Sequence, residues 1–267
     1  MPLPLLAVNG TELYYERRGS GEPLLLIMGM SGTHLSWGDP FLHALGDGLD
    51  VVTYDHRGIG ESGPQPESTT IVGLADDAAG VLDALGWETA HVLGVSMGGM
   101  VAQELALRHP ERIRRLVLAC TYPGGEGARL ADEAVVQELG GALMSGDRER
   151  ALRAGYSANL STAYAGDEAN YASFQAMASK LPVPIPVIMA QMQAVLGHDA
   201  SARLMAIDKP TLVIHGTEDR MLPVINGELI ARLIPNSRLE LLDGLGHMFW
   251  WEQPERSAAL VRSHVTR

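Results

Sequence analysis

The chain has 267 residues, a formal net charge of −12 and a hydrophobic content of 46%. This length fits one large α/β domain or two small ones, with enough apolar residues for a sizeable core. The acidic charge argues against nucleic acid or an anionic membrane as a partner. No signal-peptide pattern opens the chain, and no stretch approaches the roughly 18 apolar residues of a membrane span. We therefore expect a cytoplasmic protein.

The N-terminal half is predicted to be a hairpin followed by alternating strands and helices. Asn9-Gly10 is a strong two-residue turn signal between the expected strands Leu5–Asn9 and Glu12–Arg17. Pro23–Met28 is a continuous apolar run, which is typical of a strand buried on both faces. The next expected elements are the strand Asp50–Tyr54, the helix Ile71–Leu85, the strand His91–Val95, a helix from Met97 to about His109, and the strand Arg115–Cys120. This alternation indicates a mostly parallel sheet with an antiparallel edge.

The strand pattern stops after Thr121 and resumes after about Asp208. The intervening residues favour helices over Ala131–Leu139, Asp147–Ala158, Asp167–Leu181 and Val187–Leu196, with a proline-rich break at 182–186. The last expected elements are the strand Thr211–Ile214, the helix Ile225–Leu233, the strand Leu239–Leu242 and the helix Pro254–Val265. We therefore predict a core domain of residues 1–120 and 209–267, with a helical insertion at 121–208. A separate domain is the less favoured alternative, because the sheet pattern resumes afterwards.

The most specific motif is Gly94-Val95-Ser96-Met97-Gly98, which has the form G-x-S-x-G. It lies between an expected strand and an expected helix, and this context favours a nucleophilic serine over a chance match. In such a turn the serine adopts strained backbone geometry at the carboxyl end of a sheet. The flanking glycines allow close backbone approach because they carry no Cβ.

A nucleophilic serine needs a base, and the base needs an orienting carboxylate. His247 is the best candidate base, because it lies in a glycine-containing loop directly after the last expected strand. Asp219 is the best candidate acid, since it follows the strand ending at Ile214 and precedes the next helix. Glu218 is its competitor. The alternative role of His247 is that of a structural loop histidine.

An oxyanion hole needs two N–H donors. One candidate is the N–H of Met97, which follows the serine, and the other is the N–H of Met30 in the loop after the strand Pro23–Met28. An ordinary strand-to-helix turn is the alternative reading of that loop. Cysteine and histidine spacing does not match a zinc site, and no Walker A or G-x-G-x-x-G motif occurs. We therefore expect neither a metal nor a cofactor.

Taken together, these motifs resemble the α/β-hydrolase fold superfamily over nearly the whole chain. The matching segments are Gly29, 55–62, 94–99, 216–219 with Pro223, and 246–247 followed by 252–255. The chain order Ser, Asp, His is the order of this superfamily. One departure is Met28, where many members have histidine before the glycine of the oxyanion loop. A backbone donor does not depend on that side chain.

The resemblance implies an eight-stranded sheet whose second strand is antiparallel, flanked by helices, and a helical cap inserted after the sixth strand. A serine nucleophile disfavours the dehalogenase and epoxide hydrolase branches, which use aspartate. The chain looks most like small serine esterases, enol-lactonases, polyketide methylesterases and cofactor-free haloperoxidase-like enzymes. We expect hydrolysis of a small ester or lactone. Perhydrolysis, C–C bond hydrolysis and, less favoured, ligand binding without catalysis are the alternatives. The sequence does not specify an oligomeric state, and a homo-oligomer stays open.

A hydrophobic substrate pocket is expected between the sheet edge and the cap. Methionine suits an adaptable pocket, and core packing is the alternative role of each methionine by itself. Arg57 is interpreted as part of a structural ion pair rather than as a ligand for an acidic substrate, and the single cysteine, Cys120, as a buried small hydrophobe. The pocket candidates are Gly29, Met30, His34, Trp37, Met97 and Met248 beside the catalytic loops, and Met144, Met177, Met189 and Met192 in the cap.

Overall fold

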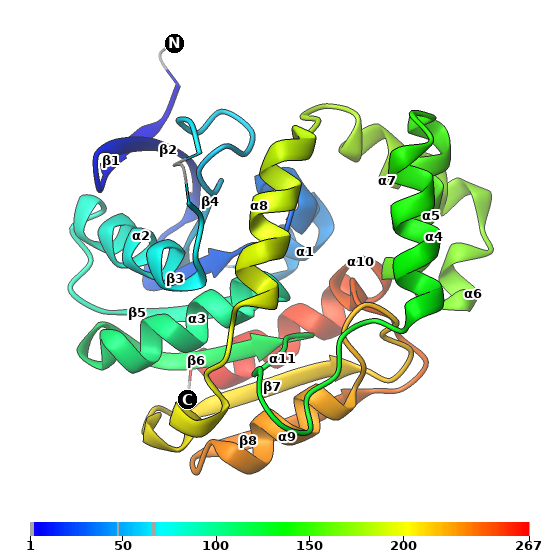
Figure 1. Cartoon of the computed structure of the whole chain (residues 1–267). Coiled ribbons are helices and arrows are strands. Elements are labelled where there is room, and N and C mark those ends of the chain that lie inside the picture. The colour runs from blue at the N-terminus through cyan, green and yellow to red at the C-terminus, as the bar shows by residue number, and fades with distance from the viewer. Residues whose placement is uncertain (1–2, 47, 66–67, 267) are drawn as a thin grey trace.

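The computed structural model describes residues 3–46, 48–65 and 68–266. Within these ranges an eight-stranded sheet has the strand order β1-β2-β4-β3-β5-β6-β7-β8 (Figure 1). The expected α/β-hydrolase fold is confirmed. The strands are β1 (Leu5–Val8), β2 (Thr11–Gly19), β3 (Gly21–Ile27), β4 (Gly48–Tyr54), β5 (Ala90–Val95), β6 (Ile113–Ala119), β7 (Thr211–Gly216) and β8 (Ser237–Leu242).

The N-terminal hairpin forms as predicted and supplies the antiparallel edge. β1 pairs with β2 in a register that sets Val8 opposite Thr11. Asn9 and Gly10 both have positive φ, 45° and 79°, as a tight hairpin turn of this type requires. β2 also runs antiparallel to β4, and β3 to β8 continue the sheet in parallel. The carboxyl ends of the parallel strands therefore meet at one edge, where ligands bind in open α/β sheets.

Helices cover both faces of the sheet, and each face has its own core. Alternate residues of the apolar strands point to opposite faces. Leu25 and Ile27 pack in the cluster under α2 (Ile71–Ala84) and α3 (Met97–Arg108), which also includes residues of α9 (Ile225–Leu233). Leu24 and Leu26 pack in the cluster that contains residues of α1 (Asp39–Ala44) and α11 (Pro254–Val265). This two-sided burial explains why β3 has a continuous apolar run rather than an alternating one.

A helical segment, residues 120–210, connects β6 to β7. Its helices α4 to α7 stand at the end of the sheet where the parallel strands terminate, and α8 crosses in front of the sheet (Figure 1). The proline-rich break, residues 182–186, precedes and enters α8, with proline in its first turn. The helices of this segment are α4 (Glu133–Met144), α5 (Arg148–Asn159), α6 (Thr162–Ala165), α7 (Glu168–Ala178), α8 (Ile185–Leu196) and the short 3₁₀ helix η3 (Ser201–Ala206).

Among the described helices, those that the sequence pattern did not predict are all short. These are η1 (His34–Trp37), α1, η2 (Pro110–Arg112), α6, η3 and α10 (Phe249–Glu252). Each has six residues or fewer, which is too short to establish a helical period. No helix in the described ranges is both long enough and apolar enough to cross a membrane.

Candidate active site

Ser96 occupies a strained turn between β5 and α3. Its φ of 55° lies in the left-handed region, which non-glycine residues rarely adopt outside functional sites. Gly94 and Gly98 make the turn possible. A Cβ on Gly94 would lie 2.2 Å from the carbonyl oxygen of Gly98, and one on Gly98 would lie 2.1 Å from that of Ile27. The Thr121 hydroxyl donates to the Ser96 carbonyl at 2.6 Å and further holds the turn.

His247 and Asp219 form a buried hydrogen-bonded pair. His247 lies in the loop after β8, and Asp219 follows β7, so neighbouring parallel strands deliver both side chains to the same edge. Nδ1 of His247 lies 2.7 Å from Oδ2 of Asp219. Such a bond fixes the ring with Nδ1 protonated and leaves Nε2 available as a base. Glu218 instead accepts from the backbone N–H of Thr162 at 3.2 Å.

The side chain of Asp219 is ionised at neutral pH. Burial by itself raises the pKa of this carboxyl, but the charges and hydrogen bonds of His247 and His215 outweigh it and hold the pKa well below its ordinary value of 3.8. Its Oδ1 also accepts from the N–H groups of Met221 and Leu222 at 2.9 and 2.8 Å. The carboxylate therefore stays charged and oriented throughout the neutral pH range.

The loop that carries His247 is clamped against residues 159–161. Glu252 accepts from the N–H of Gly246 at 2.8 Å and from the N–H of Ser161 at 3.0 Å, and it also bonds the Ser161 hydroxyl. The N–H of Met248 donates to the carbonyl of Asn159 at 2.8 Å. The residues on both sides of His247 are thus fixed to the helical segment.

The loop after β3 lies directly against Ser96. A Cβ on Gly29 would be 2.9 Å from Cβ of Ser96. His56 holds the start of this loop, because its Nε2 lies 3.0 Å from the carbonyl oxygen of Met28. Burial lowers the pKa of His56, so the ring is neutral and donates that hydrogen bond. On the far side, the N–H of Ser31 donates to Oε1 of the buried Gln191 of α8 at 2.8 Å.

Two backbone N–H groups of the loops around Ser96 have no hydrogen-bond partner among the described residues. In the described part of the chain, no hydrogen bond uses the N–H of Met30 or of Met97. Met97 is the first residue of α3, where N–H groups have no partner inside the helix. Met97 follows Ser96 in the chain, and Met30 belongs to the loop that contacts Ser96.

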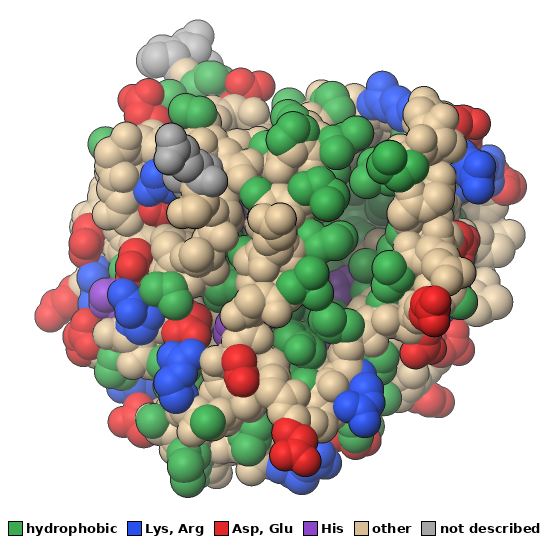
Figure 2. All heavy atoms as spheres, viewed as in Figure 1, with side chains coloured by type: hydrophobic (Ala, Val, Ile, Leu, Met, Phe, Trp, Pro, Cys, Tyr) green, Lys and Arg blue, Asp and Glu red, His purple; other side chains and the backbone are tan. Residues whose placement is uncertain are grey.

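Ser96 and His247 line the same cavity, which has a volume of about 370 Å³. Figure 2 shows a hollow with a mostly hydrophobic rim and histidine surface visible within it. The wall comes from the β3 loop and from the helical segment, and most of its residues are apolar. Besides these two residues, the lining includes Gly29, Met30, Leu143, Leu152, Phe174, Met177, Leu181, Val183, Ile188, Met221, Met248 and Trp250.

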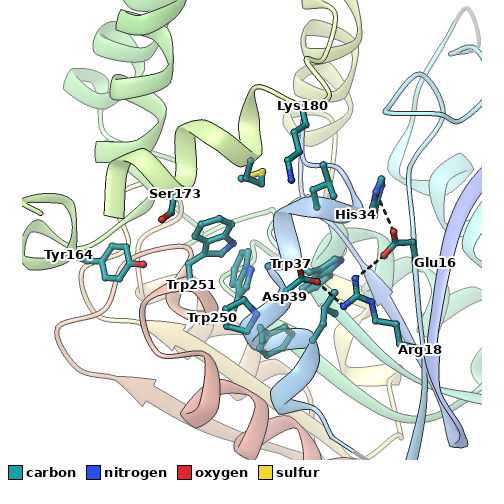
Figure 3. Close-up of a pocket in the computed structure, with 16 residues that line it drawn as sticks. Glu16, Arg18, His34, Trp37, Asp39, Tyr164, Ser173, Lys180, Trp250 and Trp251 are labelled. Atoms are coloured by element: carbon teal, nitrogen blue, oxygen red, sulfur yellow. Dashed lines mark hydrogen bonds and ion pairs between the residues drawn. The ribbon is translucent and has the colours of Figure 1, made fainter. Parts of the chain in front are cut away.

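The other predicted pocket residues lie outside this cavity, including Met97, whose side chain is fully buried. His34 and Trp37 line a neighbouring cavity of about 340 Å³, which Met177 and Trp250 also line (Figure 3). Met144, Met189 and Met192 are exposed, Met144 to 84%, and line neither cavity. Their helices carry apolar residues on several sides, so the sequence alone does not identify the inner face.

His34 has a structural environment. Its backbone N–H and its Nδ1 lie 2.6 and 3.0 Å from the two oxygens of the buried Asp55. Burial lowers the pKa of His34, but its hydrogen bond to Asp55 and the nearby charges outweigh burial and raise it. Figure 3 shows His34 with Glu16 and Arg18 at one side of the neighbouring cavity, opposite the tryptophans.

Two other interpretations from the sequence are confirmed. Arg57 forms an ion pair with Asp77, with Nε 2.5 Å from Oδ2, so it is structural. Cys120 is fully buried at the end of β6, and burial raises the pKa of its thiol well above the usual value. It is therefore not a reactive thiolate.

Sequence reasoning missed three residues that position the site: Gln191, Glu252 and His215. Nε2 of His215 lies 2.7 Å from the Leu222 carbonyl and 3.2 Å from Oδ2 of Asp219. A strand-end histidine four residues before the candidate acid was a usable signal. No local sequence pattern indicates the role of Gln191, because its partner Ser31 lies 160 residues away in the chain.

The comparisons with known proteins agree with this fold. The family model of the alpha/beta hydrolase fold matches residues 22–254. The chain is 31% identical to "Putative carbamate hydrolase RutD" of Azorhizobium caulinodans, over 92% of each chain. It is 32% identical to a poly(3-hydroxyalkanoate) depolymerase of Ectopseudomonas oleovorans, over 90% of this chain and 82% of that protein. The structure of the enol-lactonase from Burkholderia xenovorans LB400 matches with a TM-score of 0.87 at 26% identity, over 99% of this chain and 100% of that one. The chain therefore belongs to the α/β-hydrolase fold family.

Proposed function

We propose that this protein is a serine hydrolase that cleaves a carboxylic ester or lactone with a hydrophobic moiety, through an acyl-enzyme on Ser96. The observation that carries the proposal is that one apolar cavity holds both the strained Ser96 and His247, with His247 bonded to Asp219. A nucleophile, a base and an orienting carboxylate are the parts that this chemistry needs.

In the proposed reaction, Nε2 of His247 takes the hydroxyl proton while Oγ of Ser96 attacks the ester carbonyl carbon. Asp219 stabilises the imidazolium that forms. The tetrahedral intermediate collapses as His247 protonates the leaving alcohol, and the acyl group stays on Ser96. Water, deprotonated by His247, then attacks the acyl-enzyme, and His247 returns the proton to Oγ of Ser96 as the acid is released. Neither step requires a metal or a cofactor.

The N–H groups of Met30 and Met97 are the proposed oxyanion donors. The supporting observation is that neither N–H has a partner within the described residues, while their loops contact one another at Gly29 and Ser96. Loss of one such donor typically raises the barrier by about 3–4 kcal/mol. Gln191 and His56 act as positioning residues because they hold the loop that carries Met30.

Residues 121–208 are proposed to form the cap. Leu143, Leu152, Phe174, Leu181 and Ile188 from this segment face the cavity. An apolar wall favours a hydrophobic acyl or alcohol group. Two similar proteins have names that specify a poly(3-hydroxyalkanoate) and an enol-lactone as substrates, which supports an ester or lactone here. Gly29, Met177 and Met248 are the predicted pocket residues that we retain.

A substrate panel tests the reaction type. It contains nitrophenyl esters of increasing chain length, lactones, a carbamate, a β-diketone, and an ester with hydrogen peroxide for perhydrolysis. We expect turnover of esters or lactones by the wild type and none above background by Ser96→Ala of unchanged fold. Preferential cleavage of the β-diketone or the carbamate, or formation of a peracid from the ester and hydrogen peroxide, would assign one of the other activities. A folded wild type inactive on the whole panel would favour ligand binding without catalysis.

A further inference from the structure

The wall of the apolar cavity includes one permanently charged side chain among its described residues, that of Arg148, which is also exposed to solvent. Among the described residues that line it, only His247 and Arg148 are ionisable, and none is Asp or Glu. His247 is already engaged by Asp219. A cation in a wall without acidic residues has no evident role in packing the cavity.

Arg148 has no carboxylate partner in the described part of the chain. It is the first residue of α5, and its Nη2 donates a hydrogen bond to the carbonyl oxygen of Ser179 at 3.3 Å. That contact places the guanidinium beside the end of α7, next to Ala178 and Leu181, which line the same cavity. Most of its five N–H donors are left for another acceptor.

Several other arginines of the same segment and of the neighbouring cavity have carboxylate partners, whereas Arg129 and Arg150 have none among the described residues but line neither cavity. Arg153 lies one turn further along α5 and pairs with both Glu149 and Glu168. In the neighbouring cavity, Arg18 pairs with Glu16 and Asp39, and Figure 3 shows these acids around it. Lys180 also enters that cavity (Figure 3), where Glu16 and Asp39 supply opposite charge. Of these two cavities, as lined by described residues, the one that contains Ser96 therefore has a cation without an acidic residue in its wall.

We propose that Arg148 is a specificity-determining residue that binds an anionic group, of the carboxylate class, carried by the ester or lactone substrate away from its scissile bond. This proposal rests on the proposed function. The planar guanidinium can form two parallel hydrogen bonds with a carboxylate. The apolar wall between Arg148 and the catalytic residues suits a hydrocarbon linker, so the expected substrate is amphipathic.

Paired substrates test the proposal in the full-length protein. The first pair varies the acyl side: the para-nitrophenyl monoester of adipic acid against para-nitrophenyl heptanoate, which has nearly the same length and no charge. The second pair varies the alcohol side: para-carboxyphenyl butyrate against para-methylphenyl butyrate. For each pair, kcat/KM for the charged ester is divided by kcat/KM for the neutral one. Arg148→Gln is expected to lower this ratio by about five- to tenfold in one pair, mainly through KM.

Two matched variants serve as controls. Arg150→Gln removes an exposed arginine of the same helix that does not line the cavity, and it should keep the wild-type ratios. Lys180→Gln tests the neighbouring cavity and should keep them as well. Ratios unchanged by Arg148→Gln in both pairs, or lowered by Lys180→Gln instead, would overturn the proposal. If the wild type does not hydrolyse even the neutral esters, the proposed function itself is refuted.

Discussion

Nδ1 of His247 lies 2.7 Å from Oδ2 of Asp219, and the other oxygen of that carboxylate is held by two backbone N–H groups. Two backbone N–H groups therefore fix one oxygen of Asp219, while the other oxygen orients the His247 ring. Both residues are nearly inaccessible to solvent. This arrangement has consequences that mutation can measure.

Asp219→Asn should lower kcat for a nitrophenyl ester by about 10³–10⁴-fold, because the amide favours the wrong tautomer of His247 and cannot stabilise the imidazolium. Glu218→Gln is the matched control, since Glu218 contacts Thr162 rather than His247. It should keep activity within about twofold of wild type. A larger loss in Glu218→Gln than in Asp219→Asn would exchange the roles of these two acids.

Gln191→Leu should lower kcat by about three- to thirtyfold. The variant removes the acceptor for the Ser31 N–H and frees the loop that places the Met30 donor, and misplaced donors stabilise the transition state less. Gln193→Leu changes an exposed residue of the same helix and should have little effect. Equal kcat values for the two variants would show that Gln191 does not position the loop.

Glu252→Gln should reduce both stability and activity. The N–H groups of Gly246 and Ser161 donate to the same oxygen, Oε1, and the Ser161 hydroxyl donates to the other. An amide lacks the negative charge that strengthens these bonds, and it keeps the hydroxyl contact only if that bond reverses its direction. We expect a loss of about 1–3 kcal/mol in the free energy of unfolding, measured with denaturant, together with a lower kcat. Glu255→Gln, in the first turn of α11, should cost no more than about 1 kcal/mol and leave kcat unchanged. If the two variants lose equal stability, the clamp is not formed in solution.

His198 should make stability depend on pH. Burial lowers the pKa of His198 to about 4, outweighing Glu104 and Asp199, which raise it, while Arg203 lowers it further. The unfolded chain takes up this proton near pH 6.5, and the folded chain does not until about pH 4. Stability is therefore lost as the pH falls through that window, by about 1–3 kcal/mol from this residue. His198→Gln should flatten the decline between pH 6.5 and 4 in denaturant unfolding; an unchanged slope would show that His198 is not the cause.

The fold was predictable from the sequence because its long elements have strong local signals. The apolar run Leu24–Ile27 predicts a buried strand, and Asn9-Gly10 predicts the turn. Strand ends were less predictable. β3 begins at Gly21 because it pairs with Gly48, a contact between distant segments. The four-residue helices α6 and α10 are stabilised by tertiary contacts, such as the hydrogen bond of Trp250 to Ser36, and local propensity does not reveal them.

The candidate site also has residues that local sequence patterns predict and residues that only tertiary packing determines. The sequence predicts Ser96, Asp219 and His247 as candidates because each follows an expected strand. Parallel strands end at the same edge of a sheet, so residues that follow them are expected to lie close together. The choice of cavity residues in the helical segment was weaker. Met189 and Met192 face outward although α8 is apolar on several sides, whereas Gln191 between them points inward to Ser31. Only the packing direction of α8 distinguishes these positions.

Covalent labelling of Ser96 tests the central claim most directly. Incubation with a fluorophosphonate probe, followed by intact-mass and peptide-mass measurement, reports whether Ser96 is an activated nucleophile. We expect one adduct per chain on the peptide containing Ser96, formed much more slowly in His247→Ala and absent in Ser96→Ala. A folded wild type that stays unlabelled, or an adduct on another residue that persists in Ser96→Ala, would contradict it.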